Sequence, residues 1–342
     1  MTADETPGTE THTISVVVPV YKGERTLPTL VEELATLFEA RVSPDGHPYV
    51  VSEVLLVHDR GPDGSDQAMR KLAVQYPQVR AIWMSRNYGQ HAATLAGMAS
   101  SGGDWIVTMD EDGQHDPAYV PDLLDTAMRE QAQVVYAAPT NKPPHGLLRN
   151  AASRISKWIF RKWLRAGGVE TFQSYRLVLG EVGRSIAAYA GTGIYLDVAM
   201  GWVAARVAQC PVRLRDEGDR GSGYSLRSLL SHFWRLVISS GTRGLRVVSV
   251  VGMSFALFGL ALAVYVIIGN LIGNTPERGW TSVMVMISLG TGTILFSLGI
   301  VAEYVGVAVN MAMGRPLYLI TGDPEDGPLG RRPVSSGPDE QA

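Results

Sequence analysis

Apolar segments of strand length alternate with segments of helical periodicity through the first third of the chain. Residues 14–20, ISVVVPV, form a continuous, mostly β-branched run, and apolar residues recur at the spacing of one helix face over residues 27–38. Three further strand-like segments, SEVLLVHD, VRAIWMS and DWIVTMD, are separated by the helix-like segments SDQAMRKLAVQY and HAATLAGMASS. This alternation predicts an α/β fold with a mostly parallel sheet that helices cover on both faces.

Polar loops follow four of these strands. Their sequences are YKGE, HDRGPDGSD, SRNYGQ and DEDGQHD. The ligands of such sheets bind beyond the carboxyl ends of the strands, where these loops converge. We therefore expect the chemistry at this edge, with the acidic loop as one wall of a crevice.

The last third of the chain is far more apolar. Residues 247–313 are almost free of charge, and two segments, at about 247–272 and 281–309, are each long enough to cross a hydrocarbon core of about 30 Å as a helix. The short loop GNTPERG separates them, and the flanking cations are Arg235, Arg243, Arg246 and Arg315. The positive-inside rule then predicts a transmembrane hairpin, multi-pass in the cell membrane, with the N-terminal domain and both termini in the cytosol.

Small residues mark one face of each predicted span. Glycines recur at a spacing of seven, at Gly252 and Gly259 in the first span and at Gly292, Gly299 and Gly306 in the second. Such faces let helix backbones approach closely. The spacing favours tight helix packing and, through it, a homo-oligomer.

Two basic amphipathic segments precede the apolar region. Residues 146–166 place Leu148, Ile155 and Trp163 along one stripe with arginines and lysines elsewhere, and residues 225–246 form a second such segment directly before the first span. Basic amphipathic helices with tryptophans lie in membrane interfaces. We expect an interfacial helix and a juxtamembrane helix here, although a solvated face on a domain helix also fits residues 146–166.

Composition and charge set the remaining boundaries. The 342 residues carry a net charge of −3, which gives no basis for a nucleic acid partner, and the single cysteine, Cys210, excludes an intrachain disulfide. The polar, acidic start of the chain is not typical of a secretory signal, so we expect the N-terminal domain to stay in the cytosol. Residues 1–12 and 321–342 are rich in glycine, proline, threonine and acids and are predicted to be disordered. The cytosolic domain then covers residues 13–230.

The loop DEDGQHD places Asp110 and Asp112 one residue apart at the end of a predicted strand. Carboxylate oxygens suit Mg²⁺ or Mn²⁺ shared with substrate phosphates. A calcium loop of the EF-hand type needs glycine at the sixth position, whereas Gly113 comes fourth. Asp-x-Asp alone is a weak motif that also fits a solvated loop. Asp116, before Pro117, is predicted to cap the next helix.

Four segments together resemble, in order and spacing, the family 2 inverting glycosyltransferases with the GT-A fold: VVVPVYKGERTL, VLLVHDRGPDGS, SRNYGQHAATLAGM and GDWIVTMDEDGQHDP. Three later segments resemble the polyprenyl-phosphate branch, namely YRLV, GSGYSLRSLL and EYVGVAVNMAMGRPLYLI. That branch includes dolichol-phosphate mannose synthases and bacterial undecaprenyl-phosphate glycosyltransferases. The resemblance spans roughly residues 14–320. It implies a Rossmann-like GT-A domain that binds a nucleotide-sugar donor.

The resemblance also implies roles for individual residues. Nucleotide-sugar binding is implied for Pro19, Tyr21, Glu24, Asp59, Arg86, Asn87 and Asp110. Metal binding is implied for Asp110, Asp112 and Gln114, and the first two are the expected catalytic pair. Contact with the acceptor phosphate is implied for Arg176, Ser222 and Tyr224, with Arg215 and Arg220 both candidates for a further arginine.

The chain departs from the family pattern at several places, including Pro139, which stands where an arginine is usual. Two other departures bear on the chemistry. His58 and Asp59 stand where the family has two adjacent acids, which leaves the donor open between UDP- and GDP-sugars. Ser174 stands where the family has an acid sometimes proposed as a base. A phosphate monoester has a second pKa of about 6, so a lipid phosphate is already largely an oxyanion at pH 7. The loss of that acid is therefore compatible with catalysis.

These features predict a membrane-bound glycosyltransferase that depends on Mg²⁺ or Mn²⁺. It would move a sugar from a nucleotide-sugar to undecaprenyl phosphate, or to a related polyprenyl phosphate, at the cytosolic leaflet. Its product would be a lipid-linked sugar donor for cell-envelope glycosylation. One alternative is a processive polysaccharide synthase, but the Gln-x-x-Arg-Trp motif and the additional spans of that class are missing. The other is a non-catalytic membrane scaffold or lipid carrier with a decayed transferase domain. The retained Asp-x-Asp pair counts against it.

Overall fold

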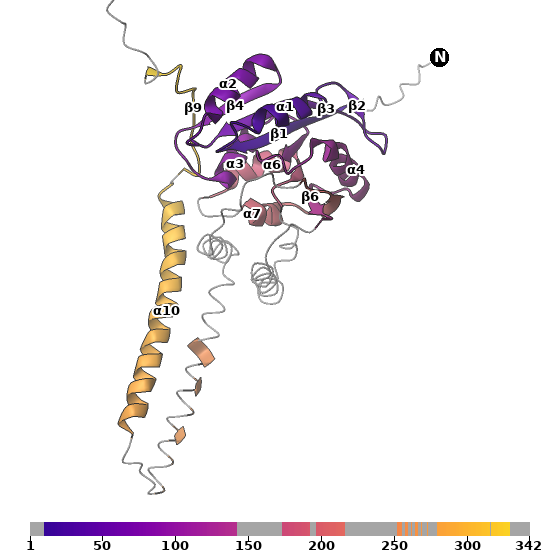
Figure 1. The fold of residues 1–342 in the computed structure, drawn as a ribbon. Helices are drawn as coiled ribbons and strands as arrows, with labels where there is room; N and C mark the ends of the chain where they lie inside the picture. Colours follow the sequence, from indigo (N-terminus) through magenta and orange to yellow (C-terminus); the bar gives the residue numbers. More distant parts are fainter. Residues whose placement is uncertain are drawn as a thin grey trace, which may run out of the picture.

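The computed structural model describes residues 10–141, 173–191, 196–215, 279–314 and 316–328, with isolated residues between 252 and 272. Within these residues, a mixed, Rossmann-like sheet organises the N-terminal domain (Figure 1). Its strand order is β8-β6-β7-β5-β1-β3-β4-β9, and β2 pairs with β3 outside that order. The strands are β1 His12–Val20, β2 Arg41–Val42, β3 Pro48–His58, β4 Val79–Met84, β5 Trp105–Thr108, β6 Val134–Pro139, β7 Arg176–Leu179, β8 Val207–Val212 and β9 Ile320–Thr321.

The centre of the sheet is parallel, as predicted. β1 pairs in parallel with β3 and β5, and β3 pairs in parallel with β4. β7 then runs antiparallel to both β5 and β6, and β8 lies parallel to β6. The antiparallel β7 makes the sheet mixed.

Helices cover both faces of the sheet, which confirms the predicted layers. One hydrophobic core receives side chains from α1 (Leu27–Ala35), α2 (Ser65–Gln75) and α4 (Val120–Glu130). The other receives them from α3 (Gln90–Ser100), α6 (Gly180–Tyr189) and α7 (Leu196–Val203). Val16 and Val18 of β1 face the first core and Val17 faces the second, and all three are fully buried. Because both faces are covered, the strand is apolar without alternation.

Asp116 caps the start of the helical segment that follows β5. Its carboxylate accepts a hydrogen bond from the backbone N–H of Ala118 at 2.9 Å. The short 3₁₀ helix Pro117–Tyr119 leads from this cap directly into α4. The predicted capping role is confirmed.

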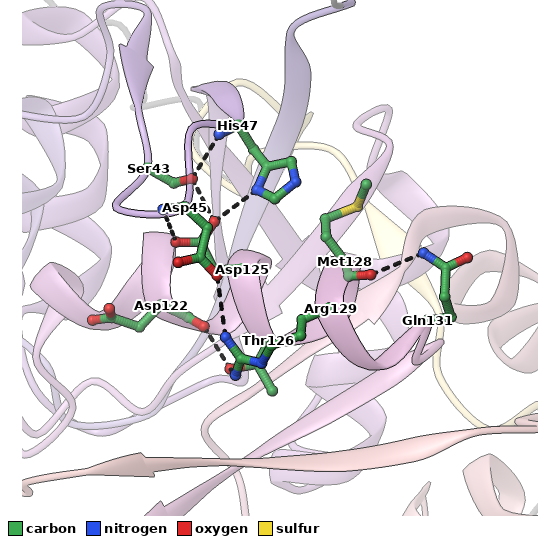
Figure 2. Close-up of polar contacts among 9 residues, drawn as sticks. All are labelled: Ser43, Asp45, His47, Asp122, Asp125, Thr126, Met128, Arg129 and Gln131. Carbon is green, nitrogen blue, oxygen red and sulfur yellow. Dashed lines mark hydrogen bonds and ion pairs between the residues drawn. The ribbon is translucent and has the colours of Figure 1, made fainter.

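A polar network fixes the turn between β2 and β3 on α4 (Figure 2). The carboxylate of Asp125 accepts hydrogen bonds from the Ser43 hydroxyl and, at 2.9 Å, from the backbone N–H of Asp45. It also contacts Nδ1 of His47 at 2.9 Å. Arg129, one turn further along α4, pairs with Asp45 at 3.1 Å. Since Asp125 is buried, these partners replace the water that its charge would otherwise need.

The long helix α10, Trp280–Ala312, coincides with the second predicted span. Its segment Leu289–Asn310 is long and apolar enough to cross a membrane, with a mean hydropathy of 1.8. The described residues of the first predicted span from 252 to 268 are helical, and Ile272 lies in a turn. The two-helix hairpin stays a prediction. The predicted basic helices at residues 146–166 and 225–246 lie outside the described residues.

The chain after α10 returns to the N-terminal domain, as Figure 1 shows for β9 beside β4. β9 pairs antiparallel with β4, and Arg70 binds the carboxylate of Asp323 through two hydrogen bonds of 2.8 Å. The prediction of disorder from residue 321 onward is therefore wrong for residues 321–328. Strand pairing and ion pairs hold this segment in spite of its polar composition. At the other end, β1 already begins at His12.

Candidate active site

A cavity of about 350 Å³ opens at the carboxyl ends of β1 and β3, beside the loops that follow β4 and β5. This is the sheet edge at which the sequence predicts the chemistry. The cavity is lined by Pro19, Val20, Tyr21, Asp59, Asn87, Gly89, Gln90, Asp110, Glu111 and Asp112. Four of these residues are acidic, and none of these described lining residues is basic. The cavity is therefore electronegative.

Side chains from two other elements hold the carboxylate of Asp110. Gln90, the first residue of α3, donates from Nε2 to Oδ1 at 2.5 Å. Ser174, two residues before β7, donates from Oγ to Oδ2 at 2.6 Å. The backbone N–H of Asp110 donates to Nδ1 of His115 at 2.9 Å. A carboxylate has about four lone-pair sites, so Asp110 retains acceptor capacity for a cation.

Glu111 connects the loop after β5 with the loop after β1. Its Oε2 accepts the backbone N–H of Tyr21 at 2.9 Å, and its Oε1 accepts that of Lys22 at 2.8 Å. Hydrogen bonds to an ionised acceptor are roughly twice as strong as neutral ones. One carboxylate of the acidic loop, that of Glu111, therefore anchors the backbone of the loop after β1. This role is not predictable from the sequence, where the only signal is the place of Glu111 between two aspartates.

Asp59, directly after β3, shapes a third part of the wall. Its Oδ1 accepts the backbone N–H of Tyr88 at 2.7 Å, and its Oδ2 accepts that of Gly89 at 2.8 Å. Burial raises the pKa of the Asp59 carboxyl, and the two hydrogen bonds lower it in part. Gly89 has φ of +93°, a left-handed conformation that favours glycine. Asp59 thus lines the cavity, as expected of a donor-binding residue, and also fixes the loop that precedes α3.

The backbone of Tyr21 lies so close to residue 61 that only glycine fits there. A Cβ atom on Gly61 would lie 1.5 Å from the carbonyl oxygen of Tyr21. The preceding residue, Arg60, has φ of +54°, and its Nε donates to the carbonyl of Met84 at 2.8 Å. The loops after β1, β3 and β4 are therefore packed as one unit around the cavity.

The structure brings most of the predicted donor-binding residues together. Besides Asp59 and Asp110, the cavity is lined by Pro19, Tyr21 and Asn87. Two predicted residues do not line it. The Oε2 atom of Glu24 accepts the backbone N–H of Gly64 at 3.2 Å, and the guanidinium of Arg86 lies 4.5 Å from the ring centroid of Tyr88. Both side chains support neighbouring loops and are exposed.

The carboxylate oxygens of the acidic loop are ligands that suit a hard divalent cation. Oδ1 of Asp112 accepts the backbone N–H of Gln114 at 3.0 Å, which closes the loop next to Asp110. No group of three acidic, histidine or cysteine side chains in the described residues forms a complete metal site on its own. Mg²⁺ usually binds one or two carboxylates together with substrate phosphates.

Arg176, predicted at the acceptor phosphate, instead points into the domain. Its side chain is 3% exposed and forms an ion pair with Asp197 of α7. Its Nε atom donates to Oγ1 of Thr108 at 3.1 Å. Burial raises the pKa of the Asp197 carboxyl, and the Arg176 guanidinium lowers it in part. The structure therefore places Arg176 in an ion pair with Asp197 and not in the lining of the cavity, and its role at the acceptor phosphate stays a prediction.

Arg215 lies beside the acidic loop. Its backbone N–H donates to the carbonyl of Gln114 at 3.0 Å. Its guanidinium pairs with Glu33 of α1 at 2.8 Å and with Asp116 at 2.9 Å. The remaining predicted acceptor residues lie outside the described residues, namely Arg220, Ser222 and Tyr224.

Comparison with known proteins supports this arrangement of motifs. The model of glycosyl transferase family 2 matches residues 15–186, half of the chain. An undecaprenyl-phosphate 4-deoxy-4-formamido-L-arabinose transferase from Yersinia enterocolitica is 28% identical over 90% of this chain and 92% of its own length. The protein of the same name from Aeromonas hydrophila is 27% identical over 91% of this chain and 94% of its own.

Solved structures align with a smaller part of the chain. The glucosyl-3-phosphoglycerate synthase from Mycobacterium tuberculosis, in complex with Mn²⁺, uridine-diphosphate-glucose and phosphoglyceric acid, is 16% identical, with a TM-score of 0.46. The alignment covers 68% of this chain and 79% of that one. The family model over the sheet and its acidic loop carries the assignment: this chain belongs to glycosyl transferase family 2.

Proposed function

We propose that the protein is a membrane-bound inverting glycosyltransferase. It moves a sugar from a nucleotide-sugar, a UDP- or GDP-sugar, to undecaprenyl phosphate or a related polyprenyl phosphate at the cytosolic leaflet. The product is a lipid-linked sugar donor for cell-envelope glycosylation. Family membership and the names of the curated relatives, which match about 90% of this chain, support the reaction class and the acceptor. The main structural observation in support of nucleotide-sugar binding is the acidic cavity at the ends of β1 and β3.

We further propose that Asp110 and Asp112 hold Mg²⁺ or Mn²⁺, with Gln114 as the third predicted ligand. When bound, the cation would supply Lewis-acid stabilisation of the leaving nucleoside diphosphate. Two features support this. The described lining of the cavity has four acidic residues and no basic one, and the two hydrogen bonds on Asp110 come from neutral side chains.

The residues around the cavity then act mainly by positioning. Ser174 and Gln90 fix the carboxylate of Asp110, and Glu111 fixes the loop of Tyr21. The acceptor phosphate, with a second pKa of about 6, reaches the site already largely ionised, so the reaction needs no base in place of Ser174. Alignment of an ionised acceptor with the sugar carbon accounts for much of the rate enhancement in such transfers.

The membrane part of the proposal rests on α10 and on the sequence. Leu289–Asn310 is the candidate span, and the segment at about residues 247–272 is the proposed second one. A hairpin of this kind places the catalytic domain and both termini in the cytosol, next to the lipid phosphate. The basic segments at residues 146–166 and 225–246 would bind anionic headgroups. The glycine faces of the spans support a homo-oligomer.

The test is transfer of label into lipid. Membranes that contain the full-length protein are incubated with undecaprenyl phosphate, Mg²⁺ and a panel of radiolabelled UDP- and GDP-sugars, including a 4-deoxy-4-formamido-L-arabinose donor. We expect one donor to carry label into the organic phase. Absence of transfer with every donor, under conditions in which a known polyprenyl-phosphate glycosyltransferase is active, would contradict the proposed reaction.

Asp112→Asn tests the metal. We expect it to lower the rate by about 100-fold or more, because the cation loses a charged ligand. Asp45→Asn is the matched control, because the Asp45 side chain forms an exposed ion pair with Arg129 and does not line the cavity, and such pairs contribute little. An Asp112→Asn variant that keeps most of its Mg²⁺-dependent activity would remove the metal from the proposal and leave the reaction class intact.

A further inference from the structure

The segment that follows α10 forms a strap over the edge of the sheet. We use this name for residues 316–328, which include β9. Leu317 and Tyr318 pack against the core on the α3 side of the sheet. In Figure 1 the strap continues from the end of α10 along β4 toward α2. Only residues 313–315 separate it from α10, so the strap links the candidate membrane span to the catalytic domain.

The strap pairs with β4 as far as the point at which that strand ends. Met84 and Trp83, its last two residues, pair with Ile320 and Thr321 of β9. The backbone N–H of Ser85, the first residue beyond β4, donates to the carbonyl of Leu319 at 2.9 Å. A strand of two residues is weak on its own, so this pairing needs further contacts to persist.

Arg70 of α2 supplies those contacts. Its Nε and Nη2 atoms donate to the two carboxylate oxygens of Asp323, each at 2.8 Å. Its Nη1 atom pairs with Glu325 at 2.8 Å and with Asp66 at 3.0 Å, and its guanidinium carbon lies 4.8 Å from the ring centroid of Trp83. The side chains of Arg70 and Asp323 are 21% and 17% exposed. A forked, partly buried pair of this kind is stronger and more directional than an exposed ion pair.

The end of β4, which the strap holds, leads into a loop that forms one wall of the donor cavity. Residues 85–89 connect β4 to α3, and Asn87 and Gly89 line the cavity. The backbone N–H groups of Tyr88 and Gly89 donate to the buried carboxylate of Asp59. Loop 85–89 is thus fixed at its end by Asp59, and at its start by the strap and by the hydrogen bond from Arg60 to the carbonyl of Met84. Release of the strap leaves only the Arg60 contact at the start of the loop.

We infer that Arg70 is a positioning residue for donor binding. It clamps the strap through Asp323 and Glu325, and the clamped strap keeps loop 85–89 in its donor-binding position and couples that loop to α10. This inference rests on the proposed function for its substrate, a nucleoside-diphosphate sugar. Arg70 does not line the cavity, so it acts through the strap and the loop.

The test uses the full-length protein in lipid nanodiscs. The double variant Asp323→Asn with Glu325→Gln removes the two negative partners that the strap offers to Arg70, and it leaves Asp66 and the residues of β9 unchanged. Asp326→Asn is the matched control, because Asp326 is exposed in the same turn and has no ion pair in the described part of the chain. Arg70→Lys keeps the charge and loses the fork. Thermal unfolding of each variant checks that the domain remains folded.

We expect the double variant to raise the KM for the nucleotide-sugar about threefold to tenfold, which is the range for loss of an ion pair of this strength. Arg70→Lys should give a smaller rise and Asp326→Asn none. The kcat and the KM for undecaprenyl phosphate should change less than about twofold, because the clamp touches neither the reacting atoms nor the acceptor. A double variant with an unchanged donor KM would overturn the inference.

Hydrogen exchange gives a readout that does not depend on activity. We expect faster exchange at the amides of residues 85–89 in the double variant, and wild-type rates in Asp326→Asn. Unchanged exchange would show that the clamp does not hold the loop and would overturn the inference for any substrate. If wild-type protein transfers no sugar, the proposed function fails, while the exchange comparison still decides whether the strap positions the loop.

Discussion

Ser174 Oγ donates a 2.6 Å hydrogen bond to Oδ2 of Asp110, the first aspartate of the acidic loop. A carboxylate in place of Ser174 would bring two negative charges together, and these would repel each other. The Ser174 hydroxyl instead stabilises the Asp110 carboxylate as a hydrogen-bond donor. The substitution that distinguishes this chain from the family pattern therefore supports Asp110 as a charged ligand.

Ser174→Ala should weaken the use of divalent cation. The variant removes one of the two side-chain hydrogen bonds on the Asp110 carboxylate, and loss of such an outer partner typically lowers metal affinity or activity about tenfold to 100-fold. The measurement is the transfer rate as a function of Mg²⁺ concentration. Ser100→Ala serves as the control, because the Ser100 hydroxyl donates to the carbonyl of Ala96 at the opposite end of α3 from Gln90. An unchanged Mg²⁺ dependence in Ser174→Ala would contradict this role.

Arg176→Met should destabilise the domain. It leaves the carboxylate of Asp197 buried without its cation, and removal of one partner of a buried pair costs about 3–5 kcal/mol of the free energy of unfolding. Urea denaturation followed by fluorescence measures the loss. Adding Asp197→Asn should recover part of it, because the amide carries no charge and still accepts the hydroxyl of Tyr136. Wild-type stability with a raised acceptor KM would instead favour the role predicted from the sequence.

The central sheet and the location of the site could be predicted because both depend on local pattern. A β-branched run such as residues 14–20 indicates a strand buried on both faces, and the strand-end rule then places the acidic loop at the ligand edge. Asp59, Asp110 and Asp112 follow from that rule and from the family motifs. All three line the cavity.

The parts that could not be predicted depend on long-range pairing. Arg176 precedes a short apolar run, and only the antiparallel register of β7 beside β5 directs its guanidinium toward Asp197. The polar segment after residue 320 has the composition of a disordered tail, yet it is ordered because Arg70 meets Asp323 about 250 positions away in sequence. Likewise, the contact of Gln90 with Asp110 requires two loops to be placed first.

Gly61→Ala should disturb donor binding. Its Cβ would lie 1.5 Å from the carbonyl oxygen of Tyr21, so the backbone that lines the cavity must move. Overpacking of this kind costs about 1–3 kcal/mol, and we expect a raised KM for the nucleotide-sugar together with a lower unfolding midpoint. Gly102→Ala is the control, since its Cβ would meet only Glu53, at 3.7 Å. A Gly61→Ala variant with wild-type donor KM and stability would show that the loops are not packed as described.

His58, the last residue of β3, should make stability depend on pH. The residue is 6% exposed, neither ring nitrogen has a hydrogen-bond partner within the described residues, and the ring meets Trp83 edge-on at 5.3 Å between centroids. Burial is the main cause that lowers the pKa of His58 below its ordinary value of 6.5. The folded protein therefore keeps the imidazole neutral at a pH at which the unfolded chain is protonated.

The sign of the effect follows from that difference in bound protons. Above pH 6.5, His58 is neutral in both the folded and the unfolded state, so the residue adds no pH dependence to stability. Below pH 6.5, the unfolded state binds a proton that the folded state excludes, and the free energy of unfolding falls. The limiting slope for one group is about 1.4 kcal/mol per pH unit. Between pH 7.5 and 5.5, His58→Gln should lose stability less steeply than the wild type when urea denaturation is measured at each pH. Parallel curves would mean that His58 takes up its proton equally in both states.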